Sequence, residues 1–130
     1  MAENINKLFV VDASFVLAFL LDEGNVEVES IFKKQALEEI HFIAPSLLRY
    51  EVGNSLRTKL LRKKMEKERA KKIYEFFLAI NIKEENPDFY SVLKLAFEKN
   101  LSFYDASYLY LAQSNKIRLL SLDHSLKEVE

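Results

Sequence analysis

The stretch Leu8-Phe9-Val10-Val11-Asp12, followed by the segment Ser14 to Leu21, decides the fold. Four consecutive apolar residues without polar alternation are typical of a strand that is buried on both faces of a parallel sheet. The segment Ser14 to Leu21 is apolar on nearly all sides, which is typical of a buried helix. We therefore predict an α/β fold whose first strand ends at Asp12.

The same alternation of strands and helices continues along the chain. Further strands are predicted at His41–Ala44, Ile80–Lys83 and Ile117–Leu122, and the middle one alternates as an edge strand does. Predicted helices lie between and after them: one carrying Val28, Ile31 and Phe32; a long one opened by Pro45 and Ser46 and running through the basic segment; one carrying Ile73, Phe76, Phe77 and Ile80; one with a single apolar stripe of Phe89, Val92, Leu93, Ala96 and Phe97; one over Phe103–Ala112; and a short one from His124. The pattern predicts a parallel sheet of four short strands, with a fifth as an alternative, covered by helices on both faces in three α/β/α layers. Such sheets place their sites at the carboxyl ends of the strands.

Composition indicates one soluble domain over residues 1–130. A chain of this length, 49% hydrophobic, buries about 70% of its unfolded surface, and two Gly and two Pro mark no linker. The absence of cysteine excludes disulfides, thiolate nucleophiles and Cys-based zinc sites, and it suits a reducing cytoplasm. Met1 to Asn6 is polar and no apolar run approaches the roughly 20 residues of a membrane span, so we expect neither a signal peptide nor a membrane anchor.

A net charge of −1 conceals an uneven distribution. The segment Arg57 to Lys72 has nine Lys/Arg and two Glu, whereas the rest of the chain has ten basic and eighteen acidic residues. This asymmetry suits a protein that holds a polyanion and keeps carboxylates elsewhere for a metal. The alternative is a solvated helix face. The candidate RNA-binding residues are Arg57, Lys59, Arg62, Lys63, Lys64 and Lys67.

Two acidic residues stand at the ends of predicted strands. Asp12 follows the first strand and Asp123 follows the last, so in a parallel sheet both fall on the same edge and point to one cleft. Each is also explained as the N-cap of the next helix. The two interpretations are compatible, because amides at a helix start orient a carboxylate and keep it ionised.

Two further acidic residues lie within predicted helices. Glu51 sits about 60° around its helix from Leu48, at the border of the buried stripe, and has no capping explanation. Gly53 in the same helix interior suggests close approach by a neighbour. Asp105 interrupts the otherwise apolar segment around it, although an N-cap at Ser102 would also explain it. If these carboxylates converge with the other two, their repulsion requires cations, and hard oxygen ligands select Mg²⁺ or Mn²⁺.

Four short motifs carry a family resemblance. They are Val10-Val11-Asp12-Ala13-Ser14, Glu51-Val52-Gly53-Asn54, Ser102-Phe103-Tyr104-Asp105-Ala106-Ser107-Tyr108 and Leu120-Ser121-Leu122-Asp123. In this order and spacing, the chain from Leu8 nearly to Glu130 resembles the PIN-domain family, and especially the VapC-type toxins of toxin–antitoxin pairs.

The resemblance implies roles for particular residues and partners. It implies metal ligands at Asp12, Glu51, Asp105 and Asp123. It implies polar neighbours that hold metal-bound water or a ligand, namely Ser14, Asn54 and Ser121. It further implies an endoribonuclease in which ion-bound water attacks the phosphodiester, a homodimer, and a small antitoxin that covers the acidic cleft. Family members continue into a further edge strand after the last acidic residue; we expect this chain to lack that strand and to hold Asp123 less firmly.

Two other functions compete with a nuclease. A phosphoacceptor signalling domain also places Asp residues at strand ends, but its site needs paired acids after the first strand, where Asp12 stands alone. A non-catalytic or RNA-processing PIN-like module would keep the fold and bind RNA through the basic segment. Phosphate-binding glycine loops are excluded by the lack of any matching pattern, and His41 and His124 are expected to be structural or exposed.

Overall fold

The sheet of the computed structural model, which describes residues 7–129, has four parallel strands in the order β3-β2-β1-β4. The strands are β1 (Leu8–Val11), β2 (His41–Ala44), β3 (Ile82–Glu84) and β4 (Arg118–Leu120). The predicted bounds of the first two strands are confirmed, whereas β3 begins two residues later than predicted and β4 is shorter. The predicted edge position of the third strand is also confirmed. Met1 to Asn6, for which we expected no signal peptide, lie outside the described residues.

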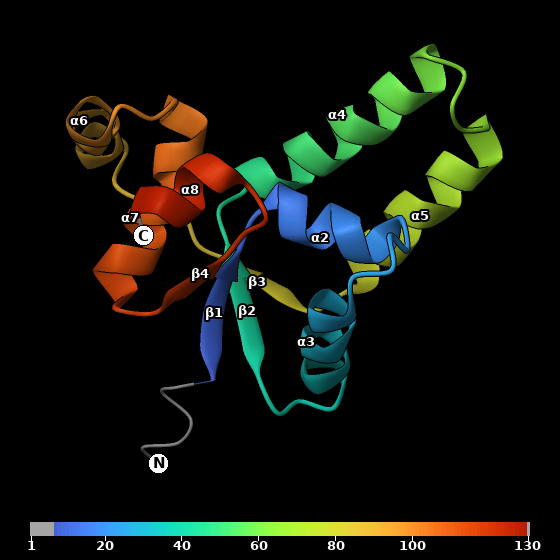
Figure 1. Ribbon diagram of the computed structural model, residues 1–130, viewed down its shortest axis with the longest axis horizontal. Coiled ribbons are helices and arrows are strands. Elements are labelled where there is room, and N and C mark those ends of the chain that lie inside the picture. The colour runs from blue at the N-terminus through green and yellow to red at the C-terminus, as the bar shows by residue number, and fades with distance from the viewer. Residues whose placement is uncertain (1–6, 130) are drawn as a thin grey trace.

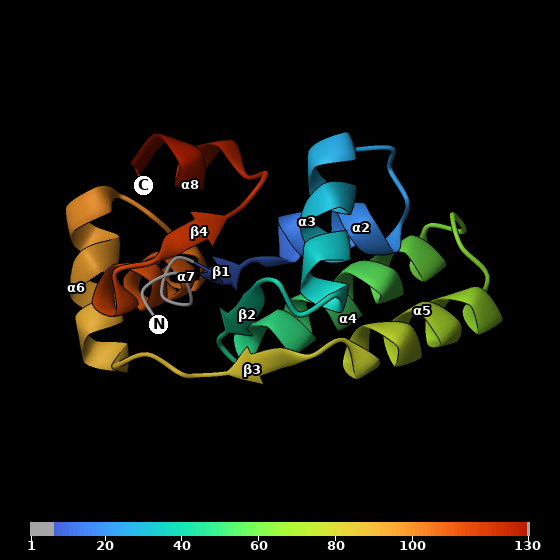
Figure 2. The same ribbon diagram turned by 90° about the horizontal axis from the view of Figure 1, so that it is seen from below.

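Helices cover both faces of this sheet. The chain passes from β1 through β2 to β3 by way of α2 (Ala13–Leu20), α3 (Val26–Ala36), α4 (Leu47–Leu61) and α5 (Lys67–Ala79), and it returns to β4 through α6 (Phe89–Lys99) and α7 (Phe103–Asn115). Because parallel crossovers are right-handed, this reversal of direction puts the two groups of helices on opposite faces. Figure 2 shows α6 and α7 on one side of the strands and α2 and α3 on the other. The predicted three-layer α/β fold is confirmed, and none of the helices in residues 7–129 is long and apolar enough to cross a bilayer.

The reversal of strand order makes the first and last strands neighbours, with β1 inside the sheet and β4 at its edge. β1 pairs with β4, so that Val10 lies opposite Leu119 and Val11 opposite Leu120. Val10 and Val11 are fully buried, as the unbroken apolar run predicted. In open α/β sheets, sites form outside the carboxyl ends of strands where the strand order reverses. The ends of β1 and β4 are therefore the expected place for the site, at the upper end of these strands in Figure 1.

We predicted one long helix through the basic segment, and this prediction is wrong. The segment forms a helical hairpin. α4 ends at Leu61, and α5 begins at Lys67 and returns beside it, projecting from the rest of the molecule (Figure 1). The turn depends on Lys63, whose φ of 58° is left-handed, and on the bond from the Lys64 amide to the Lys59 carbonyl. Lysine seldom adopts this conformation and no Gly or Pro marks the break, so residue patterns favoured a continuous helix.

The apolar stripe predicted for α6 is buried only in part. The helix itself is confirmed, and its N-cap Asp88 accepts a hydrogen bond from the Ser91 amide at 3.1 Å. Val92 and Ala96 are buried against Ala106 of α7, whereas Phe89 is 58% exposed, Leu93 39% and Phe97 77%. Val92 and Ala96 are the members of the stripe that face α7, and the larger side chains beside them remain outside. One side of α6 is therefore an exposed apolar surface.

The segment after β4 forms a helix. Residues 124–129 form α8 (His124–Val129), which is anchored by the fully buried Leu126. Within residues 7–129 the sheet has four strands, so the alternative of a fifth strand is wrong for this part of the chain. His41 and His124 are exposed, as expected.

Candidate active site

The end of β1 delivers Asp12 to the N-cap of α2. The side chain is 4% exposed, and its Oδ1 accepts hydrogen bonds from the Phe15 amide at 3.0 Å and the Ser14 hydroxyl at 2.7 Å. The second oxygen, Oδ2, accepts from the Ser121 hydroxyl. The capping interpretation is therefore confirmed, and the same bonds hold the carboxylate in one orientation.

Two serines join Asp12 to the turn after β4. The Ser14 hydroxyl accepts a hydrogen bond from the Leu122 amide, and the Ser121 hydroxyl accepts one from the Asp123 amide, each at 2.9 Å. Each hydroxyl thus bridges the Asp12 carboxylate and a backbone amide of that turn. Asp123 is consequently held beside Asp12, and its own Oδ1 accepts from the Ser125 amide at 2.9 Å. The expectation that Asp123 is held less firmly is wrong for these contacts.

Glu51 approaches from α4, at the border of the core. The predicted buried stripe of this helix is present at Leu48, Val52 and Leu56, and Glu51 beside it is partly buried. Its Oε1 accepts a hydrogen bond of 2.6 Å from the hydroxyl of Tyr108 in α7.

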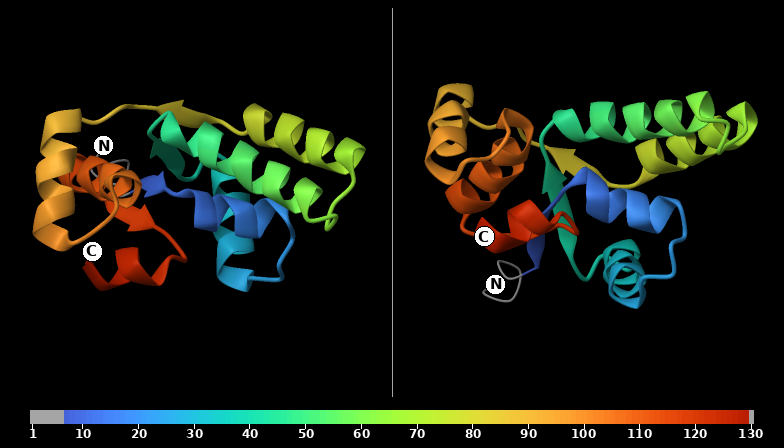
Figure 3. Two further views of the ribbon diagram at one scale, coloured as in Figure 1. Left: turned by 90° about the horizontal axis from the view of Figure 1, so that it is seen from above. Right: turned by 45° about the horizontal axis from the view of Figure 1, so that its top comes forward.

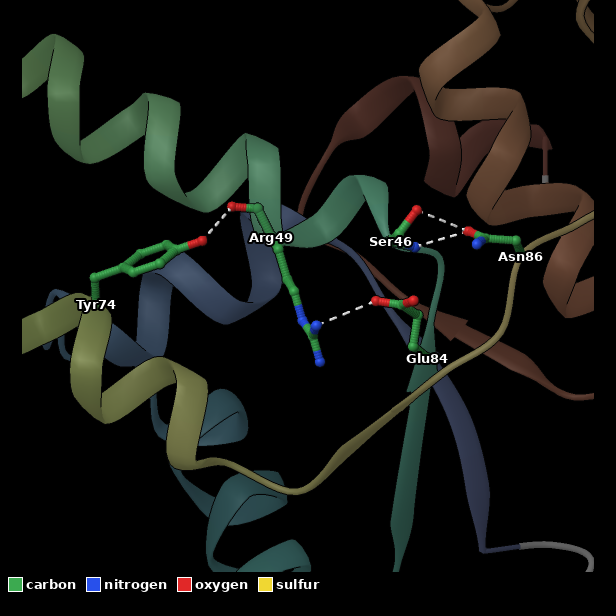
Figure 4. Close-up of polar contacts among 5 residues, drawn as sticks. All are labelled: Ser46, Arg49, Tyr74, Glu84 and Asn86. Atoms are coloured by element: carbon green, nitrogen blue, oxygen red, sulfur yellow. Dashed lines mark hydrogen bonds and ion pairs between the residues drawn. The ribbon is translucent and has the colours of Figure 1, made fainter.

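Contacts with neighbouring elements anchor the start of α4 (Figure 4). The Ser46 amide and hydroxyl both donate to Asn86 Oδ1 at 2.9 Å, and the Tyr74 hydroxyl donates to the Arg49 carbonyl at 2.8 Å. The Tyr74 ring also explains Gly53, because a Cβ there would lie 3.3 Å from the ring. The close neighbour that this glycine suggested is thus α5.

Asp105 occupies the first turn of α7. The Ser102 hydroxyl caps this helix by accepting a hydrogen bond from the Asp105 amide at 3.0 Å, as the alternative interpretation predicted. The carboxylate itself is partly buried, while Ala106 and Ser107 after it are buried. Capping therefore accounts for the position of the backbone at Asp105, and the acidic side chain lies where α7 meets the end of the sheet.

The four carboxylates are close enough for their charges to act on one another. Burial raises the pKa of Asp12, and the charge of Asp123 adds to this effect, while the hydrogen bonds from Ser121, Ser14 and the Phe15 amide oppose it. Burial also raises the pKa of Glu51; the hydrogen bond from Tyr108 opposes this effect, and the charges of Asp105, Asp12 and Asp123 add to it. Burial raises the pKa of Asp105, and the charges of Asp123 and Asp12 raise it further. Burial and then the charge of Glu51 raise the pKa of Tyr108 far above its ordinary value, so its hydroxyl stays protonated. The structure thus gathers one group of mutually repelling acids.

The donor set fits a divalent cation that retains water. All its ligand atoms would be carboxylate oxygens, which hard cations such as Mg²⁺ and Mn²⁺ prefer. Within residues 7–129, no three acidic or histidine side chains are arranged to hold an ion by themselves. Mg²⁺ in proteins commonly takes one or two carboxylates, keeps several waters and leaves positions for a substrate phosphate.

Comparison with known proteins identifies the family. Residues 9–130 match the family model described as the PIN domain. The chain belongs to the PIN-domain family. This PIN domain is 32% identical over 123 residues to ribonuclease VapC3 of Pyrobaculum aerophilum, with 92% of each protein covered. It is also 35% identical over 81 residues to exonuclease VapC9 of the same organism, covering 59% of this chain and 58% of that protein.

A solved structure has the same fold as this PIN domain. It is the crystal structure of PAE2754 from Pyrobaculum aerophilum, which matches with a TM-score of 0.75 and 28% sequence identity. The match covers 92% of this chain and 84% of that chain.

The remaining candidate residues of the PIN domain lie along α4 and the turn after it. Asn54 is exposed, and among the described residues no hydrogen bond joins it to a site carboxylate. The predicted RNA-binding residues are exposed except for the partly buried Lys59, and they are Arg57 and Lys59 in α4, Arg62, Lys63 and Lys64 in the turn, and Lys67 at the start of α5. We call residues 57–72 the basic hairpin, and Figure 3 shows it extending away from the sheet. Arg57 follows Glu51 by six residues, about 9 Å along α4, so the basic hairpin begins about that far from Glu51 and continues outward.

Sequence reasoning missed Tyr108, which contacts a site carboxylate of the PIN domain. One signal was present: Tyr108 lies three residues after Asp105, and residues at this spacing share one side of a helix. A buried tyrosine also needs a partner for its hydroxyl. The partner could not be identified, because Glu51 is 57 residues away in the sequence.

Proposed function

We propose that this PIN-domain protein is a metal-dependent endoribonuclease, acting as the toxin of a toxin–antitoxin pair. The observation that carries the proposal is the gathering of four carboxylates from separate segments at the ends of β1 and β4, namely Asp12, Glu51, Asp105 and Asp123. The names of two relatives, ribonuclease VapC3 and exonuclease VapC9, support nuclease chemistry.

In this proposal the four carboxylates hold Mg²⁺ or Mn²⁺, one or two of them by direct contact and the others through the waters of the ion. When bound, the ion supplies an activated water for attack on the phosphodiester and stabilises the leaving oxygen. Ser14 and Ser121 fix the orientation of Asp12 through their hydroxyls, and Ser121 also fixes the backbone of Asp123. Glu51 and Asp105 face the same region from α4 and α7, so the acids surround the scissile phosphate from several elements.

The basic hairpin is proposed to hold the RNA. Arg57, Lys63, Lys64 and Lys67 are exposed; Arg57 lies on α4, the helix that carries Glu51, and the three lysines lie in the turn after it and at the start of α5. Cations placed along the backbone of a single strand neutralise successive phosphates. RNA bound on the hairpin would thus lead one of its phosphates toward the acidic group.

We also propose two protein partners and a location. A small antitoxin would cover the acidic group and neutralise its charge with basic side chains. A second copy of the chain would cover the exposed apolar side of α6, where Phe89 and Phe97 stand out to solvent. Both the RNA substrate and an antitoxin would meet this protein in the cytoplasm.

Cleavage of labelled RNA tests the proposed function. Purified protein is incubated with linear and with circular single-stranded RNA, in Mg²⁺, in Mn²⁺ and in excess EDTA. The variants are Asp12→Asn and Asp105→Asn, with Asp88→Asn as a matched control, because Asp88 is an exposed N-cap outside the site. Asparagine caps a helix about as well as aspartate, so these changes remove charge without removing a cap.

The proposal expects the wild type and Asp88→Asn to cut both substrates when metal is present, and the two site variants to lose at least about 100-fold in rate. Cutting of linear RNA alone would show an exonuclease and overturn the internal cleavage. Binding of RNA without cleavage in either metal would instead indicate a non-catalytic RNA-binding module.

A further inference from the structure

Tyr108 places a buried hydroxyl against one carboxylate of the acidic group. The side chain is 1% exposed, its ring belongs to the main core, and its hydroxyl lies 2.6 Å from Glu51 Oε1. We propose that Tyr108 is a positioning residue of the active site, which holds the Glu51 carboxylate of α4 against α7 so that Glu51 and Asp105 face one metal ion. This inference rests on the proposed metal-dependent function.

Core packing alone does not require this hydroxyl. A phenylalanine would fill the same volume at position 108 without a polar atom that must find a partner in the interior. Among residues 7–129, no buried side-chain nitrogen or oxygen lacks a hydrogen-bond partner, and Glu51 is the partner that the structure gives to Tyr108. The hydroxyl therefore serves the carboxylate rather than the core.

The geometry of α7 gives this contact a second consequence. Asp105 and Tyr108 are three residues apart in α7 and lie on one side of it, so the helix presents a carboxylate and a donor together. Glu51 comes from a different helix, and its bond to Tyr108 ties α4 to α7 beside Asp105. Tyr108 thus sets the relative position of two acids that the backbone of neither helix fixes alone.

The hydroxyl also limits the freedom of the glutamate. A glutamate has more side-chain freedom than an aspartate, and the bond to Oε1 removes part of that freedom before any ion binds. With Oε1 engaged, Oε2 is the oxygen of Glu51 that remains for a metal or its water. Partners that orient a metal ligand in this way affect metal affinity even though they do not touch the ion.

A purely structural link between helices is the competing explanation, and the chain offers a matched control for it. Tyr74 also donates its hydroxyl to α4, but to the backbone carbonyl of Arg49 at 2.8 Å (Figure 4). Tyr74→Phe therefore removes a tyrosine hydroxyl bonded to the same helix without touching a carboxylate.

The test measures the affinity of RNA-free protein for Mn²⁺ by isothermal titration calorimetry, together with thermal unfolding. The variants are Tyr108→Phe, Tyr74→Phe, Glu51→Gln and the double variant Glu51→Gln/Tyr108→Phe. We expect Tyr108→Phe to weaken Mn²⁺ binding roughly 10-fold and Tyr74→Phe to leave it unchanged. The double variant should bind Mn²⁺ no more weakly than Glu51→Gln, because Tyr108 acts through Glu51.

Wild-type affinity for Mn²⁺ in Tyr108→Phe, with only a lower unfolding temperature, would overturn the proposal. So would additive losses in the double variant, or a wild type that binds no Mn²⁺. RNA cleavage in the same preparations separates this inference from the proposed function. If Tyr108→Phe binds Mn²⁺ more weakly than the wild type but the wild type cuts no RNA, the proposed nuclease is refuted and the positioning role of Tyr108 is kept. RNA cleavage by the wild type, together with unchanged Mn²⁺ affinity in Tyr108→Phe, would refute the positioning role of Tyr108 and leave the nuclease.

Discussion

The hydroxyl of Ser121 donates a hydrogen bond to Oδ2 of Asp12, although the two residues are 109 positions apart in the sequence. The hydroxyl oxygen of Ser121 also accepts a hydrogen bond from the Asp123 amide at 2.9 Å. One serine therefore orients one proposed metal ligand and fixes the backbone of another. The parallel pairing of β1 with β4 makes this possible, because it brings the ends of the first and last strands together.

Replacing this serine should cost stability. Ser121→Ala leaves an oxygen of the buried Asp12 carboxylate and the Asp123 amide without their partner, so we expect a loss of about 1–3 kcal/mol in the free energy of unfolding. Urea unfolding of metal-free protein measures the change. Ser114→Ala is the matched control, because Ser114 is exposed and should alter stability by no more than about 0.5 kcal/mol. Equal effects of the two changes would show that the Ser121 bridge contributes nothing.

Burial of the acids, together with their mutual repulsion, predicts an unusual pH dependence of stability. Asp12, Glu51 and Asp105 have raised pKa values in the folded protein, so the folded state binds their protons more tightly than the unfolded state does. Their contribution to stability is therefore fully present below the ordinary values of 3.8 and 4.5, and it is lost as the pH rises through the raised values. Asp105→Asn removes one of these charges and should stabilise metal-free protein at about pH 7, and less so at about pH 5.

Urea unfolding in EDTA at both pH values measures this difference. Asp88→Asn serves as a control of opposite sign, because hydrogen bonds from Ser91 lower the pKa of Asp88 and make its charge favourable. That variant should not stabilise the protein at neutral pH. If Asp105→Asn is no more stable than the wild type there, burial and the neighbouring charges do not disfavour the ionised Asp105 as described.

The basic hairpin should govern the salt dependence of RNA binding. Replacing Lys63, Lys64 and Lys67 with Gln should weaken binding and reduce the slope of log affinity against log salt by about 2, at roughly 0.7 per phosphate contact. Affinity for Mn²⁺ should stay unchanged. Fluorescence anisotropy at several salt concentrations measures the slope.

A charge-matched control separates this role from net charge alone. Lys33, Lys34 and Lys99 are exposed on α3 and α6, and their replacement with Gln removes the same charge elsewhere. An unchanged slope in the hairpin variant, or equal slopes in both variants, would support the alternative that the hairpin is a solvated helix face.

The exposed apolar side of α6 should mediate self-association. Phe97 is 77% exposed, and Phe97→Glu places a charge where a second copy would bury an aromatic ring. We expect sedimentation velocity to show a dimer for the wild type and a monomer for this variant. Leu61→Glu is the control, because Leu61 is 64% exposed at the end of α4. A wild type that sediments as a monomer would contradict the proposed homodimer.

Residue patterns predicted the parts of the fold that depend on burial. The unbroken apolar run of β1 has one stable place, the centre of a parallel sheet, and Asp12 follows it wherever that strand lies. The same reasoning put Asp123 at the end of the last strand, although β4 ends at Leu120, three residues before it. The border position of Glu51 followed from the helical period. These inferences succeed because each depends on neighbours in the sequence.

The features that depend on distant or unusual contacts could not be predicted in the same way. The break between α4 and α5 depends on left-handed Lys63, which no glycine marks. Phe97 seemed part of a buried stripe, but α7 covers only the side of α6 that carries Val92 and Ala96. The bond from Tyr108 to Glu51 joins two helices that come together only in the folded protein.

Binding of Mn²⁺ tests most directly whether the acids form a metal centre. Electron paramagnetic resonance of free Mn²⁺ is followed while wild type, Asp12→Asn and the capping control Asp88→Asn are titrated without RNA. The four-carboxylate site predicts binding by the wild type and by Asp88→Asn, with affinity at least about 10-fold weaker in Asp12→Asn. Equal affinity of the wild type and Asp12→Asn for Mn²⁺ would contradict it, and would leave Asp12 as a helix cap alone.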